Sequence, residues 1–562
     1  GSTVVGNAIA VWAMLDGAPQ DQAMVPGAVG VLLGESIPRG EGRRRTARDR
    51  LDEWAAAASP SGLPRHDGFS LFLRLSEDAV GVQPDLLGIF PVFHTVCDGT
   101  RMVSSSPWLL AAHLGFRMTV DPEGLVGLLL ANSIFSGRTV YLGVRRLEAG
   151  AILVSDREEG WREVPGSQIP VTSAGHHLPV PEIIARLDEL LNAAVARHLA
   201  GVGPSLLLLS GGLDSRLLAG LLSRAALPIT AITHGVPTDL DAQLAGRVAR
   251  TCGFPHHLTT RTATSRGLAS AIRWDGLTHA PGSGGGGQRI SIRGHRVVNG
   301  HLMDSIMGGS HMLAGYDRAT RTTGFDAFLT HIGRWGLSPA TLGRLLRRDV
   351  FGDALEAVTD RVRVEYQNAG QSGLERAWRF DIRHRQRLHV GHALWRLAFS
   401  DWPSTPGLDQ EVIAAVAEVP LPLISERRLQ VGLLLRKFPR LASLPIDRDS
   451  DDTRAHDPRL RDLVTQEIRG RLQQTIRNLR PGQWTPPERR YYHRVFDLNG
   501  PGWRAIRSDL EPHRELAYQL FERDCFDTIV PRPEARWMGD AMTGASGIKT
   551  LLGTVSLLRQ VG

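Results

Sequence analysis

Short apolar runs interrupted by turn signals dominate the first part of the chain. Ile89–Val96 and Ala151–Val154 are two such runs, and the pairs Asp98-Gly99 and Ala149-Gly150 are typical turn residues. Apolar runs of four to eight residues bounded by such pairs favour β-strands. The pattern therefore predicts a β-rich domain over residues 1–170.

A different pattern begins near residue 171. Val171–Pro181 is polar, with a glycine and prolines, and is interpreted as a linker. Glu182–Leu199 carries apolar residues at helical spacing. Ser205–Leu209 is an apolar strand, and a helix is predicted from about Ser215. The second domain is therefore predicted to cover residues 182–562.

Further strand-then-helix units follow in this second domain. Ile229–Thr233 precedes the helical pattern Asp241–Cys252, and Arg296–Asn299 precedes a glycine-rich turn. Such alternation is typical of a parallel α/β sheet. Gly282–Gly287 is predicted to be a mobile loop, and the chain is mostly helical and arginine-rich from about Phe325.

Composition excludes several classes of protein. The chain has 562 residues and a net charge of +7, yet only two of its 65 basic residues, Lys437 and Lys549, are lysines. Neither lies in the Gly-Lys-Ser/Thr sequence of a Walker phosphate loop. No basic block with interleaved aromatics indicates a nucleic-acid partner, and no apolar run is long enough to predict a membrane span.

The three cysteines, Cys97, Cys252 and Cys525, are far apart and have no metal-binding spacing. An odd cysteine count argues against a disulfide framework, and no signal peptide is visible. We therefore expect a reducing, cytoplasmic location.

The strongest motif is Ser210-Gly211-Gly212-Leu213-Asp214-Ser215, between a strand and a helix. Glycines let the backbone approach a pyrophosphate closely, and N–H groups at a helix start favour anions. The Ser210 and Ser215 hydroxyls can donate hydrogen bonds to phosphate oxygens. Asp214 can bind Mg²⁺, which prefers carboxylate and phosphate oxygens. The motif thus predicts a lysine-free nucleotide site.

This motif resembles the PP-loop of the ATP pyrophosphatase superfamily, whose members cleave ATP to AMP and pyrophosphate by adenylating a substrate. Val298–Asp304, followed by Gly308-Gly309, is similar to a motif of class B asparagine synthetases. The resemblance implies ATP and Mg²⁺ as cofactors, with Asp304 as the second metal carboxylate beside Asp214. It also implies an adenosine pocket lined by Leu208, His234 and Gly300.

The first domain resembles the glutaminase domain of the same enzymes, which has an Ntn-type αββα fold. The resemblance rests on four segments: Asp67-Gly68-Phe69, Asp85–Pro91, Arg101–Leu110 and Arg138–Leu147. Such a glutaminase uses an N-terminal cysteine, whereas the first cysteine here is Cys97. With no such nucleophile, glutamine would supply no ammonia. The attacking amine is then expected to belong to the substrate.

β-Lactam synthetases and lasso-peptide cyclases share this loss, and both close rings by forming an intramolecular amide. Asparagine synthetases carry Glu and β-lactam synthetases Tyr at the position of His301. An imidazole there can take a proton from the attacking amine. The family places a carboxylate partner just before a segment matched by Pro406–Asp409, which makes Asp401 the candidate. The late catalytic lysine of the family is replaced by Arg448, with Arg454 nearby.

The preferred hypothesis is a lasso-peptide macrolactam synthetase. It adenylates an Asp or Glu side chain of a leader-freed core peptide, and the peptide's N-terminal amine closes the ring. The resemblance implies a precursor peptide, a protease that removes the leader and a leader-recognition protein as partners. The alternatives are a β-lactam-type synthetase acting on a small β-amino acid, a degenerate nucleotide-binding scaffold and, ranked last, a tRNA-modifying PP-loop protein.

Overall fold

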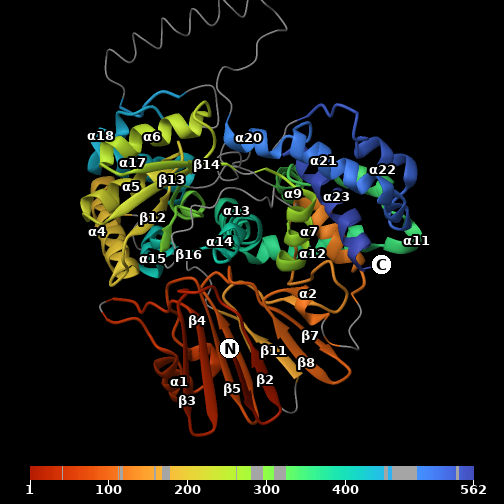
Figure 1. Ribbon diagram of the computed structural model, residues 1–562, viewed down its shortest axis with the longest axis horizontal. Coiled ribbons are helices and arrows are strands. Elements are labelled where there is room, and N and C mark those ends of the chain that lie inside the picture. Colours follow the sequence, from red (N-terminus) through yellow and green to blue (C-terminus); the bar gives the residue numbers. More distant parts are fainter. Residues whose placement is uncertain are drawn as a thin grey trace, which may run out of the picture.

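The computed structural model describes most of the chain (Figure 1). The described residues are 1–40, 42–111, 113, 118–156, 160–166, 177–260, 262–279, 295–308, 324–447, 453–457, 490–539 and 543–561. They form a mixed α/β structure, as the alternation of patterns predicted.

An antiparallel six-stranded sheet dominates the N-terminal region, in the order β11-β10-β6-β5-β4-β3 (Figure 1). Its strands are β3 (Gln20–Val25), β4 (Ala28–Gly34), β5 (Ser70–Ser76), β6 (Val80–Pro84), β10 (Ile152–Asp156) and β11 (Gly160–Val164). Successive residues of a strand point to opposite faces. Val31 and Leu33 therefore join one core, whereas Leu32 packs against Leu51 of α1 (Ala47–Ala56) on the other face.

Smaller elements complete this region. They are the hairpin of β1 (Ser2–Val5) and β2 (Ala8–Val11), the sheet of β7 (Phe93–Cys97), β8 (Thr100–Ser104) and β9 (Arg145–Arg146), and the helices η1 (Pro60–Gly62), α2 (Pro107–Leu110) and α3 (Pro122–Ala131). The turn between β7 and β8 is the predicted pair Asp98-Gly99, and both residues have positive φ.

Helix α3 departs from the expected αββα layering. Every residue from Gly124 to Ala131 is buried, so the helix needs cover on all sides. Leu125 and Leu129 share a core with Phe328 and Val362, which belong to the C-terminal helices. The N-terminal sheets are thus present, but α3 crosses the predicted boundary at residue 170.

A parallel five-stranded sheet forms the second region, in the order β14-β13-β12-β15-β16. Its strands are β12 (Ser205–Leu208), β13 (Ile229–His234), β14 (His256–Thr259), β15 (Arg296–Val298) and β16 (Trp402–Ser404). Helices α4 (Val180–Leu199), α5 (Leu213–Arg224) and α6 (Leu240–Cys252) follow the predicted pattern. Helix α4 begins inside the predicted linker, of which residues 171–176 lie outside the described residues.

The remaining chain is helical, as predicted from about residue 325, and α23 lies within its core (Figure 1). The elements are α7 (Ser265–Asp275), η2 (Asp304–Gly308), α9 (Phe325–Gly333), α10 (Pro339–Leu345), α11 (Arg348–Phe351), α12 (Ala354–Asn368), α13 (Gly373–Asp381), η3 (Ile382–Val390), α14 (His392–Leu397), η4 (Pro406–Leu408), α15 (Gln410–Ala417), α16 (Leu421–Ile424), η5 (Ser425–Arg427), α17 (Arg428–Lys437), α18 (Pro439–Ala442), α20 (Tyr491–Phe496), α21 (Pro501–Leu510), η6 (Glu511–Gln519), α22 (Arg523–Ile529) and α23 (Gly544–Val561). Within the described part of the chain, no helix combines the length and hydrophobicity that crossing a membrane requires.

Candidate active site

The predicted nucleotide loop lies where the order of the parallel sheet reverses. The chain runs from β12 outward through β13 and β14, then returns to the other side of β12 as β15. In open α/β sheets ligands bind outside the carboxyl ends of the strands at such a point. The loop from Ser210 to Ser215 follows the carboxyl end of β12 directly. Topology therefore places the motif where a ligand is expected.

Hydrogen bonds within the loop fix its shape. The hydroxyl groups of Ser210 and Ser215 are 3.0 Å apart, and the Ser215 hydroxyl also accepts the Ser210 N–H at 3.0 Å. The Gly212 N–H donates to the Ser210 hydroxyl at 3.2 Å, and no side chain caps the start of α5. Both hydroxyls thus shape the loop, while their donation to phosphate remains a prediction.

Arg216 holds the loop from behind. Its buried guanidinium donates to the carbonyl oxygens of Gly211 and Leu444, at 3.4 and 2.9 Å. Burial lowers the pKa of Arg216 to about 10, so the group stays charged at neutral pH. The Asp447 N–H donates to the Gly211 carbonyl at 3.1 Å, and Arg490 pairs with the Asp447 carboxylate at 2.9 Å. The segment around residue 445 therefore packs directly on the nucleotide loop.

Gly300 lets the segment Val298–Asp304 lie closely against the nucleotide loop. A Cβ atom at Gly300 would lie only 2.9 Å from the Cβ of Asp214, so a larger residue would displace one of the two segments. Leu302, two residues on, has a φ of +69°, which L-residues seldom adopt. The chain then enters the turn η2 at Asp304. This close approach explains the need for glycine beside the loop.

The two predicted metal carboxylates converge on the start of α17. The Gln430 amide donates to the Asp214 carboxylate at 2.5 Å, and the Arg427 guanidinium lies 3.5 Å from that of Asp304. Arg427 and Gln430 are three residues apart, so one short segment contacts both acids. The Arg427 guanidinium partly neutralises Asp304, whereas the neutral Gln430 amide orients Asp214. The binding of Mg²⁺ by Asp214 and Asp304 stays a prediction.

Leu208 and His234 lie at the carboxyl ends of adjacent strands, beside the loop. Leu208 is half-buried at the end of β12, where it pairs with Ile232 of β13. His234 Nδ1 is 2.7 Å from the Thr259 hydroxyl, and its ring lies 5.8 Å from that of Tyr491. Their location suits the predicted adenosine pocket, which stays a prediction.

Asn299 orients His301. The Asn299 amide nitrogen donates to the Ser404 carbonyl at 3.4 Å, so its oxygen faces His301, accepting the His301 N–H at 3.2 Å and lying 3.0 Å from Nδ1. In this network Nδ1 carries the hydrogen, and Nε2 of a neutral ring carries the lone pair. His301 can therefore act as a base through Nε2.

The structure does not bring Asp401 to His301. Arg296 pairs with Trp402 and Val298 with Ser404, so Asp401 precedes the amino end of β16. His301 lies beyond the carboxyl end of β15. Three strand residues alone separate the two levels by about 10 Å. The register of β15 and β16 therefore does not favour the pairing expected from the motif, and the role of Asp401 stays a prediction.

The structure does not show which residue replaces the late catalytic lysine of the family. Arg448 lies outside the described residues, and Arg454 is exposed on the segment 453–457. Lys437 pairs with Asp188 at 3.4 Å, and Lys549 is buried with its ammonium 4.7 Å from the ring of Phe496. Both lysines thus make an ion pair or a packing contact within the fold.

The cysteine thiols are not activated. Burial raises the pKa of Cys252 to about 11, and burial also raises the pKa of Cys97 and of Cys525. Catalytic cysteines instead have a lowered pKa, because the thiolate is the nucleophile.

A cavity of about 570 Å³ lies between the two regions, lined by residues such as Arg39, Leu87, Glu148, Arg379 and Gln410. None of its described lining residues belongs to the predicted nucleotide site. This cavity is therefore separate from the predicted nucleotide site.

Comparison with known proteins gives one family match. Residues 186–273 match the family model described as asparagine synthase. The match includes the loop from Ser210 to Ser215 and ends before Gly300, His301 and Asp304. It supports the asparagine synthetase-like character that the loop predicted. No curated protein matches the chain.

Two solved structures match part of the chain. One is glutamine phosphoribosylpyrophosphate amidotransferase from B. subtilis complexed with ADP and GMP, at 13% identity and a TM-score of 0.17 over 44% of this chain and 49% of that one. The other is an allosteric regulatory enzyme of purine biosynthesis, at 14% identity and a TM-score of 0.18 over 56% and 60%. The match spans less than two thirds of either relative, and scores this low carry no argument.

Proposed function

We propose that this protein is an ATP-dependent macrolactam synthetase that closes a ring in a peptide, as a lasso-peptide cyclase does. The family match at residues 186–273 indicates an ATP-dependent, amide-bond-forming ligase. The observation that carries the proposal is that Asp214, in the glycine loop, and Asp304 both contact the short segment from Arg427 to Gln430. The peptide substrate is the finer part of the proposal.

In the first step, a side-chain carboxylate of the peptide attacks the α-phosphorus of ATP. A carboxylate–phosphorus bond forms, the bond to the bridging oxygen breaks, and pyrophosphate leaves. The N–H groups at the start of α5 favour the phosphate charge. Asp214 and Asp304 would hold Mg²⁺, which neutralises the charge of the leaving pyrophosphate. Arg216 keeps the loop in position throughout.

In the second step, the peptide's N-terminal amine attacks the acyl-adenylate carbonyl. The amide bond forms, AMP leaves with the pair of electrons from the broken bond, and the amine loses a proton. His301 Nε2 accepts that proton, while Asn299 holds the opposite ring nitrogen. Holding amine and adenylate in one molecule gives a large gain in effective concentration.

Two observations favour a peptide that supplies its own amine. None of the three cysteine thiols has the lowered pKa that glutamine cleavage requires. His301 also stands where β-lactam synthetases carry Tyr, which favours the peptide over a small β-amino acid. A precursor peptide, a leader protease and a leader-recognition protein are the partners that this function implies.

The test combines ATP and Mg²⁺ with linear peptides that carry a free N-terminus and an internal Asp or Glu. We expect peptide-dependent pyrophosphate release and a product one water lighter than the peptide. An N-acetylated peptide should still release pyrophosphate but form no ring. Turnover of a small β-amino acid in place of every peptide would support the β-lactam-type alternative, and unchanged ATP in all mixtures would contradict both.

His301→Ala separates the two steps. Ring closure should slow by more than about tenfold, because a positioned base contributes at least that much, while pyrophosphate release changes less. His257→Ala, on the exposed side of β14, is the matched control. Equal loss of both steps would reduce His301 to a structural role.

A further inference from the structure

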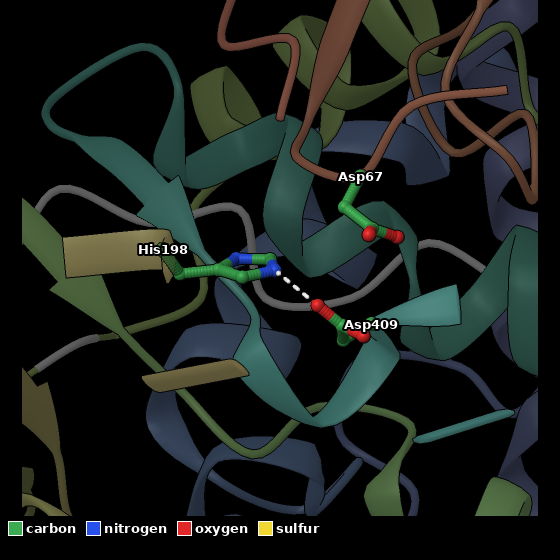
Figure 2. Close-up of side chains that lie close together, drawn as sticks. All are labelled: Asp67, His198 and Asp409. Atoms are coloured by element: carbon green, nitrogen blue, oxygen red, sulfur yellow. Dashed lines mark ion pairs between the residues drawn. The ribbon is translucent and has the colours of Figure 1, made fainter. Parts of the chain in front are cut away.

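Three ligand-type side chains meet where the N-terminal region touches the parallel-sheet region. Asp67 comes from the loop before β5, His198 from the last turn of α4, and Asp409 from the N-cap of α15. Their ligand atoms all lie within 4.8 Å of one another, and all three residues are buried. Figure 2 shows them converging on one point from three segments.

Two of these side chains carry a buried polar atom that has no hydrogen-bond partner in the described chain. Asp67 Oδ1 accepts the Gln410 N–H at 2.8 Å, whereas the buried Asp67 Oδ2 has no hydrogen-bond partner in the described chain. His198 Nε2 is likewise buried without a hydrogen bond there, although Asp67 is 2% exposed and His198 1%. A buried polar atom left in this way costs about 1–3 kcal/mol. Both residues belong to the cluster whose ligand atoms lie within 4.8 Å of one another, so one ligand could satisfy both.

The spacing suits a metal ion better than a hydrogen bond. His198 Nε2 lies 3.4 Å from Asp409 Oδ2, which is long for a charged hydrogen bond. Two ligands of a tetrahedral zinc ion, each about 2.0–2.1 Å from it, are separated by about this distance.

The charges around the point also favour a cation. Arg197 donates to Asp409 at 2.7 Å, but the same guanidinium pairs with Glu411, also at 2.7 Å. One positive charge is thus shared among three carboxylates, those of Asp67, Asp409 and Glu411. A divalent cation would neutralise the remainder.

We propose that Asp67, His198 and Asp409 bind a structural divalent transition-metal ion, of the chemistry of Zn²⁺, that ties the two regions of the chain together. An imidazole ligand favours zinc over Mg²⁺, which prefers oxygen ligands. The site is separate from the nucleotide acids Asp214 and Asp304. It does not depend on the proposed peptide cyclisation.

The test measures bound metal in the full-length, tag-free protein. The chain is treated with chelator, loaded with Zn²⁺, dialysed, and analysed by mass spectrometry of the metal. Asp67→Asn and His198→Gln should each lower bound zinc by about one ion per chain. Asp52→Asn, an exposed acid on α1 that belongs to neither site, is the control that should keep it. Circular dichroism checks that each variant is folded.

Cobalt and thermal unfolding provide second readouts. Co²⁺ loaded in place of Zn²⁺ should give visible absorption in the wild type that both junction variants lose. Zn²⁺ should raise the Tm of the wild type and leave the Tm of folded Asp67→Asn unchanged. Equal zinc content in wild type and variants would overturn the proposal. A wild type that binds no zinc would also overturn the proposal. In that case a shared proton, and not a metal ion, would lie among the three side chains.

Discussion

Two pairs of carboxylates in this chain differ in their surroundings. The Asp304 side chain is 22% exposed and Asp214 is half-buried, both at the carboxyl edge of the parallel sheet. Asp67 and Asp409 are 2% and 0% exposed at the junction of the two regions. Partly exposed acids at such an edge can receive a soluble nucleotide and its metal. Buried acids instead need a permanent counter-charge.

The residues that contact the two pairs of carboxylates also differ. Asp214 and Asp304 meet Gln430 and Arg427, which belong to one short segment. Asp409 is fixed by Arg197 and caps α15 through the Glu411 N–H. The first pair is thus arranged around an accessible point, and the second pair is built into the packing. The comparison predicts that changes at the first pair affect catalysis and changes at the second affect metal content and stability.

The largest effect should come from the nucleotide acids. Asp214→Asn should lower pyrophosphate release by more than about 100-fold, because metal–phosphate contacts are worth several kcal/mol. A pyrophosphate-coupled assay measures this, and Tm should change little. Asp52→Asn is the control, since Asp52 is an exposed acid on α1. Activity of Asp214→Asn within about tenfold of wild type would remove its metal role.

Gly300→Ala sharpens the same comparison without changing charge. The added Cβ would lie 2.9 Å from the Asp214 Cβ, so Asp214 must shift. A displacement of about 1 Å can cost about 100-fold in rate, and we expect a loss of about 10- to 100-fold in kcat for pyrophosphate release. Gly203→Ala, where a Cβ meets no neighbour, should retain activity. Full activity of Gly300→Ala would show that the two motifs do not act together.

Gln430→Leu should have a smaller effect. It removes the amide that donates to Asp214 but leaves the carboxylate in place. The loss of one such hydrogen bond, about 1.5 kcal/mol, predicts a decrease of about tenfold in kcat/KM for ATP. Gln243→Leu, at an exposed position of α6, controls for the substitution itself. An unchanged kcat/KM would mean that Gln430 does not orient Asp214.

A buried acid behind the loop should affect stability and not the rate of catalysis. Burial and the charge of Asp447 raise the pKa of Asp241 to about 6 from 3.8. The folded state holds this proton more tightly than the unfolded chain, so stability falls as the pH rises from about 4 to about 6. Asp241→Asn should remove up to about 3 kcal/mol of this decrease. Urea unfolding across this pH range measures it, and identical pH profiles for both proteins would contradict the assignment.

The sequence predicted the parts of this site that local patterns determine. The loop from Ser210 to Ser215 has a strand before it and a helix after it, so both its position and its backbone geometry followed from neighbouring residues. Asp304 was found because it follows Gly300 at short range. No local pattern indicated that Arg427 and Gln430 contact these acids. The contact with Asp214 joins residues that are more than 200 positions apart in the chain.

The departures from the sequence-based expectations have the same cause. Asp401 was assigned by its distance along the chain from a motif, whereas the parallel register of β16 decides which edge of the sheet it occupies. Helix α3 was assigned to the N-terminal domain by sequence order, but its apolar surface is covered by the C-terminal helices. The meeting of Asp67 with His198 likewise depends on how the two regions pack.

One measurement tests the central claim most directly: the products formed from ATP in the presence of a linear peptide with a free N-terminus and an internal Asp or Glu. The account predicts AMP and pyrophosphate in equal amounts with a peptide one water lighter, and none of these products with Asp214→Asn. Formation of ADP and phosphate, or pyrophosphate release that does not depend on the added substrate, would contradict it.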